Sequence, residues 1–400
     1  MFDDELRWID AQRPELTDRL IRWSEINSGS FELAGLSRME RELCEAFAPL
    51  ADNAEQLELP PARAIDSGGR EIASPLGKAL RFICRPQAPL RVLLSIHYDT
   101  VFAADHPFQR TRRVDEDTLI GPGVVDAKGG ILVMLAALRA LERSPVAGRI
   151  GWEVLLNPDE EIGSPGSANL LAEAARRNQV GLVFEPAMPD GSLVGARKGS
   201  GTFVTVVRGR AAHAGRDFQR GRSAILALAE LIMTLRPTDR PGVIINCGRI
   251  EGGGAVNIVP DLAIGRFNVR ADSAEDQTWI EQFFRAAADR VGQTDGIRVE
   301  LHGGFSSPPK PLDARSAKLM DHVLAAGRAL GMPLSYQPSG GTCDGNKLAA
   351  AGLPVVDSLG PVGGELHSDR EYVRLSSLTE RAKLVALLLM KLAAGELSPP

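Results

Sequence analysis

The chain has 400 residues, of which 44% are hydrophobic and 24% are charged, and its formal net charge is -5. A single ordinary core does not accommodate this length, so we expect two domains. The mild acidity gives no electrostatic reason to expect nucleic acid or an anionic membrane as a partner.

Cysteine usage and the start of the chain both favour a cytoplasmic protein. The four cysteines lie far apart without Cys-x-x-Cys spacing, which argues against a zinc–thiolate site and against a disulfide framework. Residues 1–6 are acidic and lack the basic and apolar regions of a secretion signal. The longest apolar run, residues 131–138, is too short to cross a bilayer.

The first hundred residues predict helices that cover a sheet. Apolar residues at helical spacing predict amphipathic helices around residues 16–23 and 39–50. A buried parallel strand is predicted at residues 92–94, where three aliphatic residues follow one another. His97 and Asp99 come after it two residues apart, which places both side chains on one face of an extended chain. The pair fits a zinc ligand with an orienting carboxylate, and equally a hydrogen-bonded loop histidine.

A glycine-rich segment, residues 119–130, leads into an apolar helix predicted at residues 131–141. Asp126 lies near the start of this helix. One interpretation is a helix N-cap behind a flexible loop. The other is a carboxylate held rigidly enough to bridge two cations, with glycines that let the backbone pass close to the site.

Carboxylates also follow two further predicted strands. The apolar run at residues 152–156 leads to Asp159, Glu160 and Glu161, and the run at 181–184 leads to Glu185. A surface charge cluster is the simple interpretation of the first group. In open α/β sheets, however, ligands bind outside the carboxyl ends of strands. One glutamate could then ligate a metal while its neighbour acts on water.

The middle of the chain predicts a second domain inserted into the first. Between residues 200 and 306 the expected order is strand, helix, strand, strand, helix, strand, which is that of a ferredoxin-like unit. Residues 1–199 and 307–400 would then form one domain. A last buried strand is predicted at residues 354–359, and His367 follows it. A final helix is predicted at about residues 378–394.

The sequence resembles a known family when these features are combined. Two imidazoles and three carboxylates could hold a pair of zinc ions. The resemblance is to the co-catalytic zinc peptidases and amidohydrolases that include glutamate carboxypeptidase, acetylornithine deacetylase, succinyl-diaminopimelate desuccinylase and aminoacylase. Gly341, Thr342 and the stretch 367–373 are most similar to the glutamate carboxypeptidase branch. The matching stretches run in the family's order: 95–101, 121–130, 159–164, 184–186, 209–215 and 367–373.

The resemblance implies a role for each residue of this set. It implies two Zn²⁺ per subunit, with Co²⁺ or Mn²⁺ able to substitute, and a cis peptide bond after Asp126. Glu160 would be the general base and Asp99 would orient a ligand. The implied metal ligands are His97 and Glu185 on one ion, Glu161 and His367 on the other, and Asp126 as the bridge.

The inserted domain is expected to serve as a lid and to carry a homodimer contact. His213 would reach into the partner's active site to stabilise an oxyanion, although its position alone fits a hydrogen-bonded turn histidine. Asn257, Arg270, Gly341 and Thr342 would bind substrate, since an arginine fork suits a carboxylate. As an alternative, Arg270 would be an exposed strand residue. Residues 302–304 lack the basic residue that glutamate-specific members place there, which argues against glutamate specificity.

The predicted protein is therefore an α/β metal-dependent hydrolase. Its catalytic domain would be a mixed, largely parallel sheet flanked by helices, and its inserted domain would be ferredoxin-like α+β. We expect it to cleave the amide of an N-acyl amino acid or the C-terminal residue of a small peptide, as glutamate carboxypeptidase does. The alternatives are a deacylase of the acetylornithine or desuccinylase type and a non-catalytic relative that binds a small amide.

Overall fold

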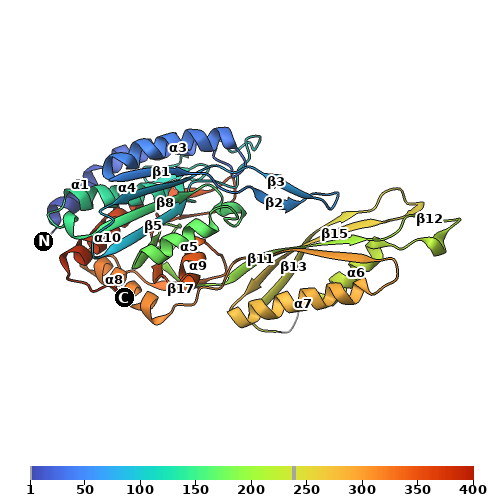
Figure 1. Ribbon diagram of the computed structural model, residues 1–400. Helices are drawn as coiled ribbons and strands as arrows, with labels where there is room; N and C mark the ends of the chain where they lie inside the picture. The colour runs from blue at the N-terminus through green and yellow to red at the C-terminus, as the bar shows by residue number, and fades with distance from the viewer. Residues whose placement is uncertain (1, 237–239) are drawn as a thin grey trace.

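The computed structural model describes residues 2–236 and 240–400. Figure 1 shows a larger part, in which helices surround a sheet, and an elongated part that extends from it. The elongated part contains β11, α6, β13, β15, α7 and β16, which follow one another along the chain. The division into domains at residues 200 and 306 stays a prediction.

The sheet of the larger part is mixed and mostly parallel. Strands β8, β5, β9 and β18 pair in parallel, and β4 and β1 extend one edge antiparallel. This agrees with the predicted fold class. In sheet order the strands are β1 (Asn53–Leu57), β4 (Ala79–Cys84), β8 (Gly151–Asn157), β5 (Arg91–His97), β9 (Val180–Val183) and β18 (Val355–Val356).

Successive side chains of each strand point to opposite faces of the sheet, so the core of the larger part has one layer on each face. Leu94 and Val154 belong to a cluster that includes side chains of α4 and α10, whereas Leu93 and Leu155 pack with side chains of α5 and α9. The helices on the first side are α1 (Asp3–Ala11), α2 (Arg13–Ser24), α3 (Leu33–Phe47), α4 (Lys128–Arg143), α8 (Ala314–Ala329) and α10 (Leu375–Ala394). Those on the second side are α5 (Ala168–Arg177) and α9 (Asp344–Ala350).

The elongated part is a four-stranded antiparallel sheet in the order β13-β15-β11-β16, with α6 and α7 packed on one face. Counted along the chain this order is 2-3-1-4, which is the ferredoxin-like arrangement that the sequence predicted. The last strand continues several residues past the predicted end near residue 301. The elements are β11 (Gly199–Arg208), α6 (Ala224–Thr234), β13 (Val243–Gly252), β15 (Leu262–Ala271), α7 (Ala274–Gly292) and β16 (Arg298–Ser307).

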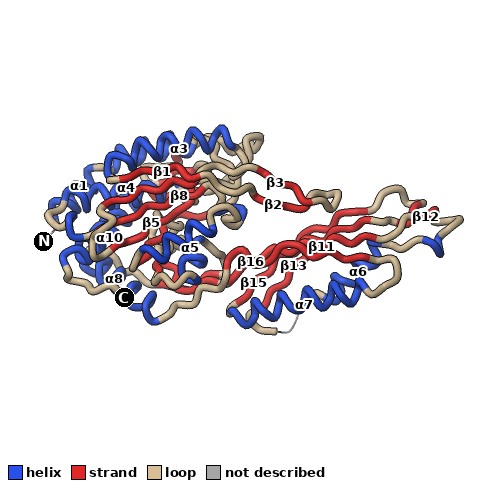
Figure 2. The backbone as a smooth tube through the Cα atoms, viewed as in Figure 1, coloured by secondary structure: helices blue, strands red, loops and turns tan. Residues whose placement is uncertain are grey.

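A hairpin that the sequence analysis did not predict packs its turn end against the other face of this sheet. Strands β2 (Ala62–Ile65) and β3 (Glu71–Ser74) leave the larger part and reach the inserted strands (Figure 2). Ile65 packs against Val204, Val206 and Ile264, and Arg208 donates a hydrogen bond to the carbonyl of Gly69. The hairpin therefore joins the two parts at a second place, away from the points where the chain crosses.

Short strands complete the structure. A four-stranded sheet in the order β19-β20-β7-β6 lies beside α10, and β10 pairs with β17 in parallel. No helix among the described residues is long and apolar enough to cross a membrane. The remaining strands are β6 (Arg112–Arg113), β7 (Thr118–Ile120), β10 (Leu193–Arg197), β12 (Ala212–His213), β14 (Ile258–Val259), β17 (Tyr336–Ser339), β19 (Gly363–Gly364) and β20 (Tyr372–Arg374).

Candidate active site

Three neighbouring parallel strands deliver functional side chains to one edge of the sheet. Strand β5 ends at His97, which is in register with Asn157 at the end of β8. A single 3₁₀ turn, Glu160–Ile162, follows β8, and Glu185 follows β9 by two residues. Because the carboxyl ends of parallel strands meet at the same edge, residues far apart in sequence gather there.

Asp126 lies between two histidines, and each of its carboxylate oxygens faces a different one. Oδ1 is 3.1 Å from Nε2 of His97, and Oδ2 is 3.4 Å from Nε2 of His367. Nε2 of His367 is also 3.3 Å from a carboxylate oxygen of Glu161. The ligand atoms of His97, Asp126 and Glu161 all lie within 4.8 Å of one another. This is the arrangement that a bridging carboxylate requires.

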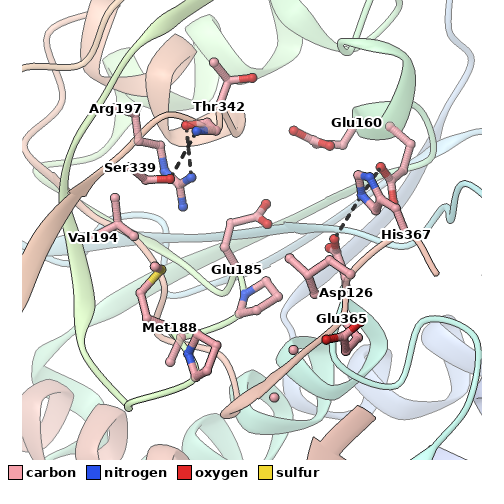
Figure 3. A pocket seen from close by; sticks show the side chains of 18 residues that line it. Asp126, Glu160, Glu185, Met188, Val194, Arg197, Ser339, Thr342, Glu365 and His367 are labelled. Atoms are coloured by element: carbon pink, nitrogen blue, oxygen red, sulfur yellow. Dashed lines mark hydrogen bonds and ion pairs between the residues drawn. The ribbon is translucent and has the colours of Figure 1, made fainter. Parts of the chain in front are cut away.

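Two cavities open beside this cluster. One, of about 340 Å³, is lined by Asp126, Glu185 and the apolar side chains of Met188 and Val194, among others (Figure 3). The other, of about 400 Å³, is lined by Arg270 and residues of β11 and β16. Both cavities share five lining residues: Glu160, Glu161, Gly341, Thr342 and His367. A substrate that spans both would place its central bond beside the cluster.

The electrostatics of the cluster reflect crowded negative charge. Burial raises the pKa of Glu185 to about 8, and burial also raises the pKa of Glu160 well above its ordinary value. Burial would lower the pKa of His97, but hydrogen bonds with Asp126 and Asp99 raise it well above its ordinary value. Asp126 and Glu161 raise the pKa of His367 to about 11. Imidazole and carboxylate donors with this excess of negative charge fit divalent cations.

The chain matches the model of peptidase family M20/M25/M40 over residues 93–391. It belongs to this family. The predicted resemblance is therefore confirmed, and the chain is a metal-dependent hydrolase of the peptidase and amidohydrolase type. The non-catalytic alternative is set aside.

Two relatives and one solved structure illustrate the family. Carboxypeptidase G2 of Pseudomonas sp. (strain RS-16) is 31% identical over 314 residues, which cover 76% of this chain and 74% of that protein. A succinyl-diaminopimelate desuccinylase of Alkalilimnicola ehrlichii is 28% identical over 301 residues, which cover 72% and 78% of the two chains. An M20 metallo-carboxypeptidase of Sulfolobus solfataricus has a TM-score of 0.74 at 17% identity, covering 95% of this chain and 99% of that one. This likeness confirms the fold class.

Asp99 contacts four other residues in this M20 site. Nδ1 of His97 is 3.1 Å from the carbonyl oxygen of Asp99 and 3.3 Å from its Oδ1, and the orienting role of Asp99 stays a prediction. The carboxylate also accepts hydrogen bonds from the backbone N–H groups of Glu160 and Glu161 and from the hydroxyl of Ser30. The sequence offered no signal for these contacts, because they depend on how the turn after β8 folds back.

Glu371 is a site residue whose role the sequence analysis missed. Its carboxylate is buried and accepts hydrogen bonds from the backbone N–H groups of Gly123, Val125 and Asp126. It therefore fixes the loop that carries the central carboxylate. The family likeness of the stretch 367–373, which contains Glu371, is the signal that the sequence offers for it. The peptide bond between Asp126 and Ala127 is cis, as the resemblance implied, and Ala127 rather than Asp126 is the N-cap of α4.

The predicted substrate residues separate into two groups. Arg270, Gly341 and Thr342 line the cavity beside Glu160, so they lie at the site. His213 and Asn257 lie together instead: β12 pairs with β14, and the N–H of Ala214 donates to the carbonyl of Asn257. Figure 1 shows β12 at the end of the inserted strands farthest from the six-stranded sheet. Within one chain, these two residues do not reach the cluster.

Proposed function

We propose that this M20 hydrolase releases an amino acid with a free α-carboxylate from an N-acyl amino acid or a small peptide. Arg270 is the observation that carries the proposal. Its Nη1 is buried and has no hydrogen-bond partner among the described residues, and burial lowers the pKa of its guanidinium. An unpaired guanidinium in a cavity that also contains Glu160 and His367 calls for an anionic group of the substrate.

We assign two zinc ions to the cluster, with Asp126 between them. The two carboxylate oxygens of Asp126 face different histidines, which supports a count of two ions. His97 and Glu185 would complete one ion, and Glu161 and His367 the other. When bound, the ions would polarise the scissile carbonyl and lower the pKa of a bound water to about 7.

The protein's own groups would then position the substrate and move the proton. Glu160 lines both cavities, so its carboxylate would be within reach of both the attacking water, from which it would take a proton, and the leaving amine, to which it would give that proton. Burial raises the pKa of Glu160 above its ordinary value, which favours a carboxyl that accepts a proton. Arg270 would hold the carboxylate of the leaving amino acid and so fix the amide over the cluster.

A homodimer would supply the part of the site that one chain lacks. Leu226 and Met233 on α6 are 69% and 63% exposed, and Ile244 and Ile250 on the edge strand β13 are 50% and 61% exposed. An apolar helix face beside an unpaired strand edge fits a second copy of the same sheet. In such a dimer we expect His213 and Asn257 of each chain to enter the partner's site.

We also propose a cytoplasmic location, in keeping with four free cysteines.

Release of free amino acid from a panel of acyl amino acids, with and without a chelator, tests the proposal. We expect hydrolysis of N-acyl amino acids, loss of activity with the chelator, and little hydrolysis of the matching C-terminal carboxamides. Arg270→Met should lower kcat/KM for the acids by about 10–100-fold and remove the preference over the carboxamides. Arg285→Met, on the exposed face of α7, is the matched control. Equal hydrolysis of acids and carboxamides by the wild type would contradict the role of Arg270.

The deacylase alternative shares this chemistry and differs in the substrate. The likeness to a desuccinylase supports it. Kinetics on N-acyl-glutamate, N-acetyl-ornithine and N-succinyl-diaminopimelate separate the two. A kcat/KM highest for either of the last two would favour the deacylase.

A further inference from the structure

Asn346, in the first turn of α9, holds together both points where the chain crosses into the inserted domain. Its side-chain amide donates hydrogen bonds to the carbonyl of Lys198, at 3.0 Å, and to that of Pro308, at 2.7 Å. Lys198 immediately precedes β11, and Pro308 immediately follows β16. Asn346 is fully buried, so water does not compete for these bonds.

The next residue, Lys347, joins one of these crossings to the turn that follows β8. Its ammonium donates to the hydroxyl of Ser307, at 3.3 Å, and to that of Ser164, at 3.2 Å, and it pairs with Asp344 at 2.9 Å. Ser307 is the last residue of β16, and Ser164 closes the turn that follows β8. All four side chains are buried. The two serines are thus connected through one ammonium group.

Ser164 is in turn bonded to the segment that carries the general base. Its backbone N–H donates to the carbonyl of Asp159 at 2.7 Å, and the N–H of Gly163 donates to the carbonyl of Glu160 at 2.8 Å. Asp344 accepts a hydrogen bond from the Ser164 hydroxyl and another from Asn157 at the end of β8. A displacement of Ser164 therefore moves the turn on which Glu160 stands.

We propose that Lys347 is a positioning residue that couples the crossing at Ser307 to the turn that carries Glu160, so that alignment of the general base depends on where the inserted domain sits. The inference rests on the proposed function, because it takes Glu160 as the base. Lys347 does not touch the substrate in this account. Its effect is expected in kcat rather than in KM.

A double-mutant cycle tests this coupling. Ser164→Gly removes one hydroxyl and suits the positive φ of 56° at this position, and Ser307→Ala removes the other. We expect each change to lower kcat while KM stays within about twofold. The double variant should depart from the product of the single effects by more than about twofold, the lower end of measured coupling between linked residues. In a Lys347→Met background this departure should vanish. If the double variant in the wild-type background lowers kcat by the product of the two single factors, the coupling is overturned.

Hydrogen exchange gives a readout that does not depend on activity. We expect Ser307→Ala to speed exchange of the amides of Gly163 and Ser164, because the hydroxyl of Ser307 is linked to that of Ser164 through the ammonium of Lys347. Ser144→Ala is the matched control, because the hydroxyl of Ser144 is buried without a hydrogen-bond partner among the described residues. Exchange that is unchanged at these two amides would overturn the coupling even in an active enzyme. Faster exchange in a protein that cleaves no acyl amino acid would support the coupling and count against the proposed function alone.

Discussion

The carboxylate of Asp99 accepts a hydrogen bond from the backbone N–H of Glu160, with 3.1 Å between Oδ1 and the nitrogen. Its other oxygen accepts one from the N–H of Glu161, at 3.2 Å. The same carboxylate lies 3.3 Å from Nδ1 of His97. One buried side chain therefore sets the orientation of a proposed zinc ligand and the position of the proposed base.

The first prediction concerns Asp99. Asn at this position keeps the shape but presents an amide that has one acceptor instead of two, so one backbone N–H of the turn loses its partner. We expect Asp99→Asn to lower kcat or metal affinity by about 10–100-fold, as changes to groups behind metal ligands do. Steady-state kinetics and metal titration measure the two effects. Asp190→Asn, in an exposed turn, should leave both unchanged.

The second prediction separates the neighbours Glu160 and Glu161. Glu160→Gln should lower kcat by about 10²–10⁴-fold, the contribution of a general base, while the metal content stays at the wild-type level. Glu161→Gln removes a proposed ligand and should lower the metal content as well. Elemental analysis of the two purified variants, together with their kcat values, makes the comparison. Loss of metal from Glu160→Gln would mean that Glu160, rather than Glu161, is a metal ligand. Full turnover by Glu160→Gln would mean that Glu160 is not the general base.

The third prediction concerns subunit exchange. His213→Ala and Glu160→Gln should each be inactive or nearly so as homodimers. In a mixed dimer, the subunit with intact Glu160 would receive His213 from its partner. The two variants are dissociated, mixed in equal amounts and allowed to form dimers again, so that about half of the dimers are mixed. Each mixed dimer has one complete site out of two, so we expect about a quarter of the wild-type activity. If mixing restores nothing while mixed dimers form, His213 does not act across the dimer.

The fourth prediction concerns acid stability. Asp357 is buried and lies 2.9 Å from Arg197 and 2.9 Å from Lys310. Burial alone would raise the pKa of Asp357, but Arg197 and Lys310 hold it below the ordinary value of 3.8. The stabilisation is thus complete above the unfolded pKa and is lost as pH falls through the lower folded pKa.

Asp357→Asn leaves two buried cations without their partner, so we expect it to lower the free energy of unfolding near pH 7 by about 3–5 kcal/mol. The difference from the wild type should narrow as pH falls below about 4, because only the wild type then loses the charge. Urea denaturation at several pH values measures this. A difference that stays constant down to pH 3 would show that the aspartate charge is not the cause.

Much of the fold was predictable because the strongest patterns are local. The aliphatic runs that end at His97 and before Glu185 are buried parallel strands, and the strand and helix order of the inserted part gives its sheet order. The β2–β3 hairpin was missed, since its strands are short and mostly exposed and become ordered by packing Ile65 on a distant sheet. No local periodicity carries that information.

The candidate site shows the same division. Metal-competent side chains after strands could be found because their chemical types are distinctive, and the structure brings His97, Asp126, Glu161, Glu185 and His367 to one edge of the sheet. The roles of Glu371 and Lys347 could not be predicted, because the role of a buried charged side chain depends on the groups to which it is hydrogen-bonded in the folded protein. Those partners are backbone groups and serines from segments far away in sequence.

The central claim is that Asp126 bridges two metal ions, and anomalous diffraction from crystals of the zinc-loaded protein tests it most directly. The account predicts two zinc peaks about 3.5–4 Å apart, one on the side of His97 and one on the side of His367, with the Asp126 carboxylate between them. A single zinc peak at full occupancy, or two peaks that do not share Asp126, would contradict it.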